Sequence, residues 1–309
     1  MTHALRIATR ESPLALWQAE HVKARLLAAH PDLSVELVPM TTRGDQLLSH
    51  SLSRVGGKGL FVKELEAAML EGRADIAVHS MKDVPSQLPA GLEISTLLQG
   101  EEVRDAFVCP SAASLAELPQ GAVVGTASLR RQAQLRQLRP DLDIREVRGN
   151  LGTRLGKLDA GEYDALLLAG AGLIRLGLPE RIAELFDVQR MLPAIGQGVI
   201  GIEQRSDDAR TRERLQALHD PVTADRVTAE RAMNACLGGA CHVPVAGHAV
   251  VSGQQICLEG LVAAPDGSRQ VRDQITGPRA DADKLGRQLA AHLLAEGGRE
   301  ILNALGIDP

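Results

Sequence analysis

A polar segment follows a short apolar run in the first third of the chain. His79 to Pro85 (HSMKDVP) comes directly after Ala74 to Val78, which has the composition of a buried strand. Ligands bind at the carboxyl ends of parallel strands, so Lys82 and Asp83 lie where chemistry is expected. An aspartate among cations stays ionised and can stabilise a developing positive charge or relay a proton. A solvated loop without a special role is the alternative.

Arginines and hydroxyls gather where later strands lead into helices. Gly125 to Arg131 (GTASLRR) indicates a strand, a turn and a helix capped by Ser128. Guanidiniums, hydroxyls and helix-start amides bind carboxylates or phosphates. Because successive βα turns meet at one edge of a sheet, the pattern predicts a site for several anions, and capped helices with exposed arginines are the alternative. The residues concerned are Thr126, Ser128, Arg130, Arg131, Arg148, Arg154 and Arg175.

One of the four cysteines lies in a loop of small residues. Cys241 belongs to Leu237 to Pro244 (LGGACHVP), between a predicted helix and a predicted strand. An accessible thiol that backbone and ligand can approach closely is a candidate nucleophile. Zinc is a weaker interpretation, because Cys236, Cys241 and His242 do not have a familiar ligand spacing. We therefore predict no metal.

Strands and helices alternate in the elements that would position these residues. Two α/β lobes are predicted, and the apolar run Leu192 to Gln204 would return the chain from the second lobe to the first. A hinged cleft would lie between them. After residue 220, a helix over Pro221 to Cys236 leads into three strands joined by turns, which is typical of an antiparallel meander. The predicted domains are residues 1–99 with 200–219, residues 100–199, and a small α+β domain over residues 220–309.

Individual elements follow from hydrophobic periodicity and helix-start signals. The predicted strands are Leu5 to Ala8, Ser34 to Met40, Ala74 to Val78, Ala106 to Cys109, Ala122 to Gly125, Asp143 to Val147, Ala165 to Ala169, His242 to Val251, Gln255 to Ala263 and Gln270 to Thr276. The predicted helices start at Pro13 with Ser12 as cap, at Gly59, after Ser128, at Leu151, at Pro221, at Asp281 and at Arg299.

Composition excludes several classes of protein. A net charge of −5 and an aromatic content of 2% argue against binding to nucleic acid. No apolar stretch approaches the ~20 residues of a membrane-spanning helix, and no secretory signal is evident at the start, so a cytoplasmic location is expected. Of the 34 basic residues only six are lysines. The arginine bias is partly compositional, and the arginines at βα turns are the informative ones.

Together these segments resemble the porphobilinogen deaminase (hydroxymethylbilane synthase) family over essentially the whole chain. The motifs follow one another in the family's order. They are Ala8 to Glu20 (ATRESPLALWQAE), Gly56 to Glu66 (GGKGLFVKELE), His79 to Pro85, Gly125 to Leu135 (GTASLRRQAQL), Val147 to Leu155 (VRGNLGTRL), Leu192 to Gly198 (LPAIGQG) and Glu230 to Val245 (ERAMNACLGGACHVPV).

The resemblance implies a transferase that makes a linear tetrapyrrole in the heme pathway. A dipyrromethane cofactor would be joined by a thioether to Cys241 rather than Cys236, by register from Glu230. Four porphobilinogens would be added in turn, each losing ammonia, before hydrolysis releases hydroxymethylbilane. Asp83, with Lys82 beside it, would be the catalytic carboxylate that stabilises positive charge on pyrrole nitrogens and helps to move protons.

The same comparison assigns the binding residues motif by motif. The cofactor would be held, besides Cys241, by Ser80, Lys82, Thr126, Ser128, Arg130, Arg131 and Gln197, and the substrate by Arg10, Ser12, Phe61, Arg148, Arg154 and Arg175. Phe61 would stack on a pyrrole, or pack in a helix core. Ala240 stands where the family commonly has glycine, and His242 replaces a frequent glutamine. Porphobilinogen is the expected partner of a monomer that binds neither nucleic acid nor membrane.

The rival interpretation is a two-lobed cytoplasmic anion-binding protein without catalysis. Periplasmic-binding-protein-like α/β lobes around a cleft also bind solutes, and fold does not determine function. The absence of a signal peptide and the third domain with its cysteine loop count against it. A metal-dependent enzyme is the third possibility.

Overall fold

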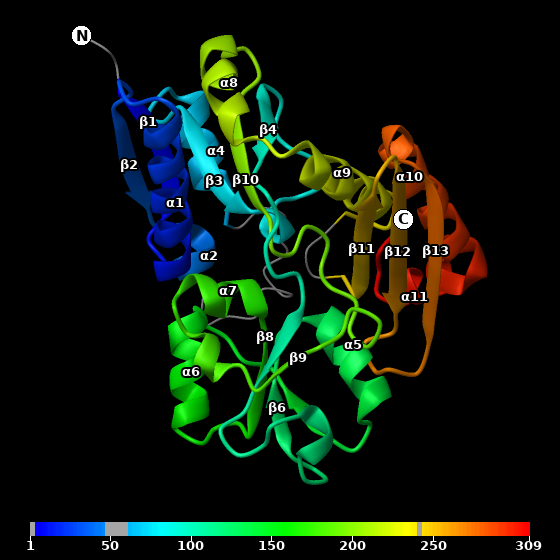
Figure 1. Ribbon diagram of the computed structural model, residues 1–309. Helices are drawn as coiled ribbons and strands as arrows, with labels where there is room; N and C mark the ends of the chain where they lie inside the picture. The colour runs from blue at the N-terminus through cyan, green and yellow to red at the C-terminus, as the bar shows by residue number, and fades with distance from the viewer. Residues whose placement is uncertain (1–3, 47–60, 240–242) are drawn as a thin grey trace. The chain divides into compact units, whose positions relative to one another are not determined.

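The computed structural model describes residues 4–46, 61–239 and 243–309 (Figure 1). The chain divides into two compact units, Met1–Glu101 with Val199–Ala224, and Glu102–Gly198 with Asp225–Pro309. Within the three described ranges, no helix is both long enough and apolar enough to cross a membrane.

The first unit is built on a five-stranded mixed sheet with the order β2-β1-β3-β10-β4. Strands β1, β2 and β3 are parallel, and β10 runs antiparallel to both β3 and β4. The strands are β1 (Leu5–Arg10), β2 (Val35–Met40), β3 (Ile76–Ser80), β4 (Leu92–Leu97) and β10 (Ile200–Arg205). The helices are α1 (Pro13–Ala29), α2 (Arg43–Gln46), α4 (Lys63–Leu70) and α8 (Ala209–Leu215), with 3-10 turns at Met81–Asp83 and Gln216–Leu218.

Helices cover both faces of this sheet because side chains alternate along each strand. Ile76 and Val78 pack with α1 in one core cluster, whereas Ala77 packs with Leu65 and Met69 of α4 in another. Helix α1 begins where Pro13 follows Ser12, whose Oγ accepts a hydrogen bond from Ala15 N at 3.4 Å.

The second unit contains a mixed sheet with the order β7-β6-β8-β5-β9. Its strands are β5 (Asp105–Val108), β6 (Val123–Gly125), β7 (Asp143–Arg145), β8 (Ala165–Ala169) and β9 (Glu184–Leu185). Strands β6, β7 and β8 are parallel, and β5 is antiparallel to β8 and β9. Helices α5 (Leu129–Leu138), α6 (Leu151–Asp159) and α7 (Gly170–Arg175) pack on it, with 3-10 turns at Leu115–Glu117 and Pro179–Arg181.

The same unit contains an antiparallel sheet of β11 (Val245–Ser252), β12 (Gln255–Ala263) and β13 (Gln270–Pro278). One face packs against α9 (Pro221–Cys236) and α10 (Ala282–Leu293), and Leu261 and Ala263 on the other face pack with Ala133 of α5. A 3-10 turn at Arg279–Asp281 precedes α10, and a π-helical turn over Leu294–Gly298, with Gly297 at φ 108°, leads into α11 (Arg299–Asn303).

The predicted fold class is confirmed: two α/β lobes are followed by a small α+β domain with an antiparallel meander. Both lobes also contain antiparallel pairs, because β10 enters the first sheet between β3 and β4 in the reverse direction and β5 enters the second in the same way. Strands β4 and β9 were not predicted. Hydrophobic periodicity identifies a strand but not its direction.

Candidate active site

The turn that carries Lys82 and Asp83 is firmly attached to the first sheet. Strand β3 lies beside β10, with Ser80 opposite Ile200, and Met81 N donates to Val199 O at 3.0 Å. A Cβ added to Gly201 would lie 2.1 Å from the Met81 sulfur, so only glycine allows that side chain to pack there. Lys82 and Asp83 follow in the 3-10 turn and are half-buried.

Other candidates of the first unit lie at the same edge of the sheet. Strands β1 and β3 are parallel neighbours, so Arg10 and Ser80 both lie at carboxyl ends. Ser80 Oγ accepts a hydrogen bond from Gln18 at 2.8 Å. The Arg10 guanidinium pairs with Asp45 and lies 4.3 Å from the centre of the Phe61 ring. The structure thus places Phe61 in a cation–π contact.

The predicted anion site in the second unit begins at the end of β6. Ser128 caps α5, because its Oγ accepts a hydrogen bond from Arg131 N at 3.4 Å. Thr126 Oγ1 accepts one from Ser128 N at 3.2 Å. Each hydroxyl is the acceptor in these bonds, which leaves its hydrogen to donate to a ligand oxygen.

A buried aspartate connects three of the candidates. Asp105 Oδ2 accepts a hydrogen bond from Arg130 at 2.6 Å, and Oδ1 accepts bonds from Arg131 at 2.7 Å and from Gln197 at 3.0 Å. Burial alone would raise the pKa of the Asp105 carboxyl, but the charges of the two arginines outweigh it and hold that pKa well below its ordinary value. Two cations face one anion, so the network keeps an excess positive charge.

The turn after β7 holds the next pair of arginines. Gly149 has φ 117°, and a Cβ there would lie 2.6 Å from a methyl of Thr153. Arg154 Nε donates to Gly149 O at 2.8 Å. Arg148 pairs with Glu146, and its buried Nε has no hydrogen-bond partner within the described part of the chain. Arg148 Nε is thus a buried donor that no described residue satisfies.

Two further polar residues hold the segment that contains Gln197. Arg175 donates to Gly198 O at 2.9 Å. Glu230 of α9 is 1% exposed and accepts hydrogen bonds from Gly196 N at 2.7 Å and from Ala249 N at 3.0 Å. Burial acts to raise the pKa of the Glu230 carboxyl, but the His248 hydrogen bond and the Arg226 charge lower it overall. Glu230 therefore links α9, β11 and this segment.

The candidate nucleophile Cys241 lies outside the described residues, as do Ala240 and His242. The chain approaches the loop from α9, which ends at Cys236, and Gly239 N donates to Asn234 O at 2.8 Å. Gly238 and Gly239 have φ of 98° and 62°, which explains glycine at both positions.

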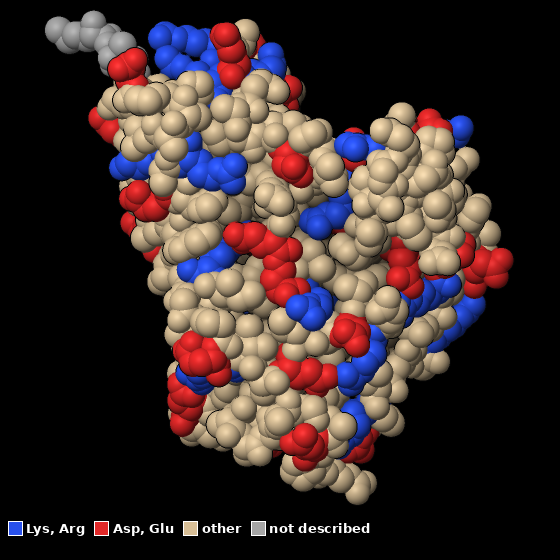
Figure 2. Space-filling model, in the orientation of Figure 1, with Lys and Arg blue, Asp and Glu red and all other residues tan. Residues whose placement is uncertain are grey.

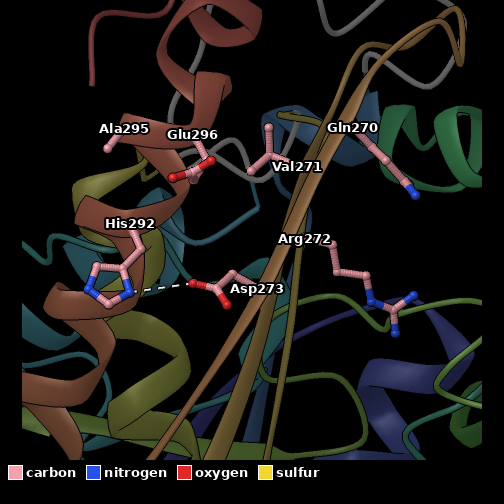
Figure 3. A pocket seen from close by; sticks show the side chains of 7 residues that line it. All are labelled: Gln270, Val271, Arg272, Asp273, His292, Ala295 and Glu296. Atoms are coloured by element: carbon pink, nitrogen blue, oxygen red, sulfur yellow. Dashed lines mark ion pairs between the residues drawn. The ribbon is translucent and has the colours of Figure 1, made fainter.

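Other polar features do not involve the candidates. A surface pocket of the antiparallel domain is lined by Asp273, His292, Glu296 and their neighbours (Figure 3), and none of the predicted site residues lines it. Basic and acidic side chains are interspersed over the face shown in Figure 2. Pairs such as Arg287 with Asp283 are well exposed, which agrees with a partly compositional origin of the arginine excess.

Asp105 and Glu230 were missed as positioning residues by the sequence analysis. Asp105 appears in the sequence only as one charged residue before an apolar run, and its partners are 25 and 26 positions away. Glu230 was used only to set the register of the cysteine loop. In the sequence, the only sign of a positioning role for Asp105 or Glu230 is a charged residue beside apolar ones.

Replacing Asp105 with asparagine is expected to lower the free energy of unfolding by about 3–5 kcal/mol, because two buried guanidiniums would lose their counterion. Urea unfolding at pH 7 measures the change. The control is Asp143→Asn in the same unit, whose pair with Arg145 is exposed and should contribute under about 1 kcal/mol. Equal losses in both variants would contradict the assignment.

Family models account for most of the chain. The model described as "Porphobilinogen deaminase, dipyromethane cofactor binding domain" matches residues 5–213, and "Porphobilinogen deaminase, C-terminal domain" matches residues 224–295. The chain belongs to the porphobilinogen deaminase family. The deaminase is thus a hydroxymethylbilane synthase, a transferase of tetrapyrrole biosynthesis that binds a dipyrromethane cofactor. The alternative of an anion-binding protein without catalysis is not favoured.

Several solved structures are similar to this deaminase at low identity. The methionine-binding protein MetQ is 16% identical with a TM-score of 0.47, covering 74% of this chain and 94% of its own. The periplasmic VFT2 domain of Bordetella pertussis BvgS is 16% identical with a TM-score of 0.43, covering 74% and 92%. A nutrient-binding protein from Burkholderia cenocepacia, bound to methionine, is 15% identical with a TM-score of 0.43, covering 71% and 92%. None of them indicates an activity.

Proposed function

We propose that this hydroxymethylbilane synthase carries its dipyrromethane on Cys241 through a thioether. We further propose that Asp83 is the carboxylate that stabilises positive charge and transfers protons at each addition. The observation that carries the proposal is the match of both family models, which span the HSMKDVP turn and the LGGACHVP loop. Asp83 follows strand β3, whose parallel neighbour β1 ends at Arg10.

The second unit has the donors that the carboxylates of a dipyrromethane require. The Asp105 network holds Arg130 and Arg131 rigidly and retains a positive excess, while Thr126 and Ser128 each have a hydroxyl hydrogen to donate. Planar guanidiniums in a fixed orientation bind carboxylates better than flexible ammonium groups. We assign these four residues to the cofactor, together with Gln197, Lys82 and Ser80.

The remaining candidates are assigned to porphobilinogen. Each monomer brings an acetate and a propionate, so negative charge accumulates as the product grows. Arg148 offers a buried Nε, and Arg175 is 7% exposed and held in place by Gly198. Arg10, Ser12, Arg154 and Phe61 complete the set. In this assignment the Phe61 ring supports the Arg10 guanidinium and offers an apolar surface to a pyrrole.

Asp83 would transfer protons and stabilise positive charge during the reaction. The dipyrromethane supplies the free pyrrole carbon to which the first porphobilinogen is joined. Each addition breaks the bond to the amino group, releases ammonia and forms a carbon–carbon bond, so one proton is needed at the leaving amine and one is lost from a ring carbon. A carboxylate can transfer both protons in turn and stabilise the positive charge that develops on the pyrrole nitrogen.

The cellular setting and the division into domains belong to the same proposal. We propose a cytoplasmic monomer with three domains, residues 1–99 with 200–219, residues 100–199 and residues 220–309. The separate antiparallel sheet over β11 to β13 supports a distinct third domain.

The proposal predicts that freshly purified protein has an intact mass above that of the 309-residue chain by one dipyrromethane. The excess should survive denaturation, because a thioether is covalent. Electrospray mass spectrometry under denaturing conditions measures it. An unmodified mass in folded protein that makes hydroxymethylbilane would contradict covalent attachment.

A further inference from the structure

A glutamine in helix α5 binds both backbone polar groups of one distant residue. Gln134 is 4% exposed, and Leu192, which lies 58 positions further along the chain, is fully buried. Gln134 Oε1 accepts a hydrogen bond from Leu192 N at 2.7 Å, and Gln134 Nε2 donates one to Leu192 O at 3.1 Å. The side-chain amide therefore binds Leu192 in the way that the backbone of a neighbouring antiparallel strand would.

Both hydrogens of the Gln134 amide are used within the protein. The second Nε2 hydrogen has an acceptor one helical turn earlier, Arg130 O at 3.4 Å. These contacts also determine which end of the amide is the oxygen, because the two carbonyls require a donor and Leu192 N requires an acceptor. Gln134 can thus act on the candidate site through its neighbours rather than by contact with a ligand.

The carbonyl that Gln134 holds is also an acceptor for Arg130. Arg130 Nη1 donates to Leu192 O at 2.8 Å and to Asp105 Oδ2 at 2.6 Å, so both hydrogens of that nitrogen are bound to protein oxygens. A carboxylate of the cofactor must therefore meet another nitrogen of the guanidinium. Because the guanidinium is planar, the positions of Leu192 O and Asp105 determine the direction in which its other nitrogens point.

Leu192 begins a short segment that leads to Gln197. Gln197 Nε2 donates to Asp105 Oδ1 at 3.0 Å and to Val103 O at 2.7 Å. Asp105 in turn binds Arg130, which lies one helical turn before Gln134. Helix α5, this segment and Asp105 therefore form a closed ring, in which the contact between Gln134 and Leu192 is one of the connections.

The contact between Gln134 and Leu192 lies in apolar surroundings. Leu192 packs in one core cluster with Ala133, Ala246, Leu261 and Ala263. Water hardly reaches these groups, so removal of the amide would leave Leu192 N buried without its acceptor. The rest of the segment has attachments of its own, through Pro193 O, Gly196 N and Gly198 O. Loss of the amide should therefore displace the Leu192 end without releasing the whole segment.

We propose that Gln134 is a positioning residue for the cofactor. Through Leu192 it determines the direction in which Arg130 faces the dipyrromethane, and it keeps Gln197 against Asp105. This inference rests on the proposed assignment of Arg130 and Gln197 to the cofactor. A glutamine is needed because one side chain must present a donor and an acceptor side by side, which no apolar side chain does.

Gln134→Met tests the proposal in the cofactor-carrying enzyme, because methionine has nearly the same size but has no amide. The dipyrromethane mass should be retained, since the substitution leaves Cys241 in place. We expect kcat for hydroxymethylbilane formation to fall about tenfold, because a small displacement of the reacting groups slows the reaction strongly. KM for porphobilinogen should stay within about twofold of wild type. Gln137→Met is the matched control, because Gln137 lies in the same helix with an exposed side chain and should keep the wild-type kcat.

A double-mutant cycle with Gln197→Met shows whether Gln134 acts through the segment. If it does, the combined variant should lose much less kcat than the product of the two single losses, because either substitution already opens the ring. Single losses that multiply would overturn the proposal. A purely structural role would lower stability but leave kcat and KM of folded Gln134→Met at their wild-type values, and that result would overturn it as well.

Hydrogen exchange followed by mass spectrometry tests the contact without reference to catalysis. The Leu192 amide should exchange faster in Gln134→Met than in wild type, whereas the Gly196 amide, which Glu230 binds, should not change. Unchanged exchange at Leu192 would overturn the proposal. Wild-type kcat in Arg130→Lys would overturn the assignment of Arg130 to the cofactor and this inference with it. Wild-type kcat in Gln134→Met alone would overturn only the inference, so the two failures are distinguishable.

Gln134→Glu provides the test if Gln134→Met does not fold. Glutamate keeps an oxygen for Leu192 N, but at about pH 8.5 beside Arg130 it is ionised and has no hydrogen for Leu192 O. The carboxylate should repel that carbonyl and attract the guanidinium, so kcat should fall as in Gln134→Met. Wild-type kcat in Gln134→Glu would overturn the proposal.

Discussion

Asp83→Asn is expected to lower hydroxymethylbilane formation by roughly 10²–10⁴-fold while leaving the fold intact. Asparagine has the shape of aspartate but has no charge and cannot carry the proton. The turn has backbone hydrogen bonds of its own, since Met81 N donates to Val199 O and Val84 N donates to Met81 O. Single-turnover kinetics with porphobilinogen measures the loss, and circular dichroism checks the fold.

The matched control for Asp83→Asn lies at the other end of the same strand. Asp75 precedes β3 and pairs with Arg6 at 2.9 Å, at the opposite edge of the sheet from the turn. Asp75→Asn should cost about 1 kcal/mol of stability and leave turnover within about twofold of wild type. If Asp83→Asn also retained near-normal turnover, Asp83 would not be the catalytic carboxylate.

Local signals predicted the elements of this fold well. Ser12 followed by Pro13 located the start of α1, and its side-chain cap is present. Strand β8, strand β12 and helix α9 have the predicted bounds. Pairing was the part that could not be predicted, because β10 joins β3 from more than a hundred residues away and in the reverse direction. Nothing in its apolar run indicates which neighbours it has.

The same contrast between local patterns and long-range pairing applies to the candidate site. Arg130 and Arg131 were found from a local pattern of strand, turn and capped helix. Their partner Asp105 could not be, because a buried ion pair between distant segments leaves no periodicity in the sequence. The buried contact between His79 and Glu203 is a stronger case, since the two residues are 124 positions apart. Local patterns therefore indicated the candidate ligand-binding residues, whereas the residues that hold them in place required the three-dimensional structure.

The two cysteines near the end of α9 provide the other large effect. Cys241→Ser is expected to lack the dipyrromethane mass and to make no hydroxymethylbilane, because a serine hydroxyl is a far weaker nucleophile than a thiolate at neutral pH. Cys236→Ser is the matched control. Cys236 is the last residue of α9 and is half-buried, so serine should keep the helix, the mass excess and the activity.

Thiol labelling identifies the attached sulfur independently of activity. After denaturation, wild type should react with iodoacetamide at Cys109, Cys236 and Cys257 but not at Cys241, because a thioether sulfur is not a free thiol. Peptide mapping locates each label. Labelling at Cys241 in protein that retains the mass excess would place the dipyrromethane on another residue. Loss of the mass excess in Cys236→Ser but not in Cys241→Ser would indicate that the dipyrromethane is attached to Cys236. That thiol lies at the end of α9, before the two glycines rather than after them.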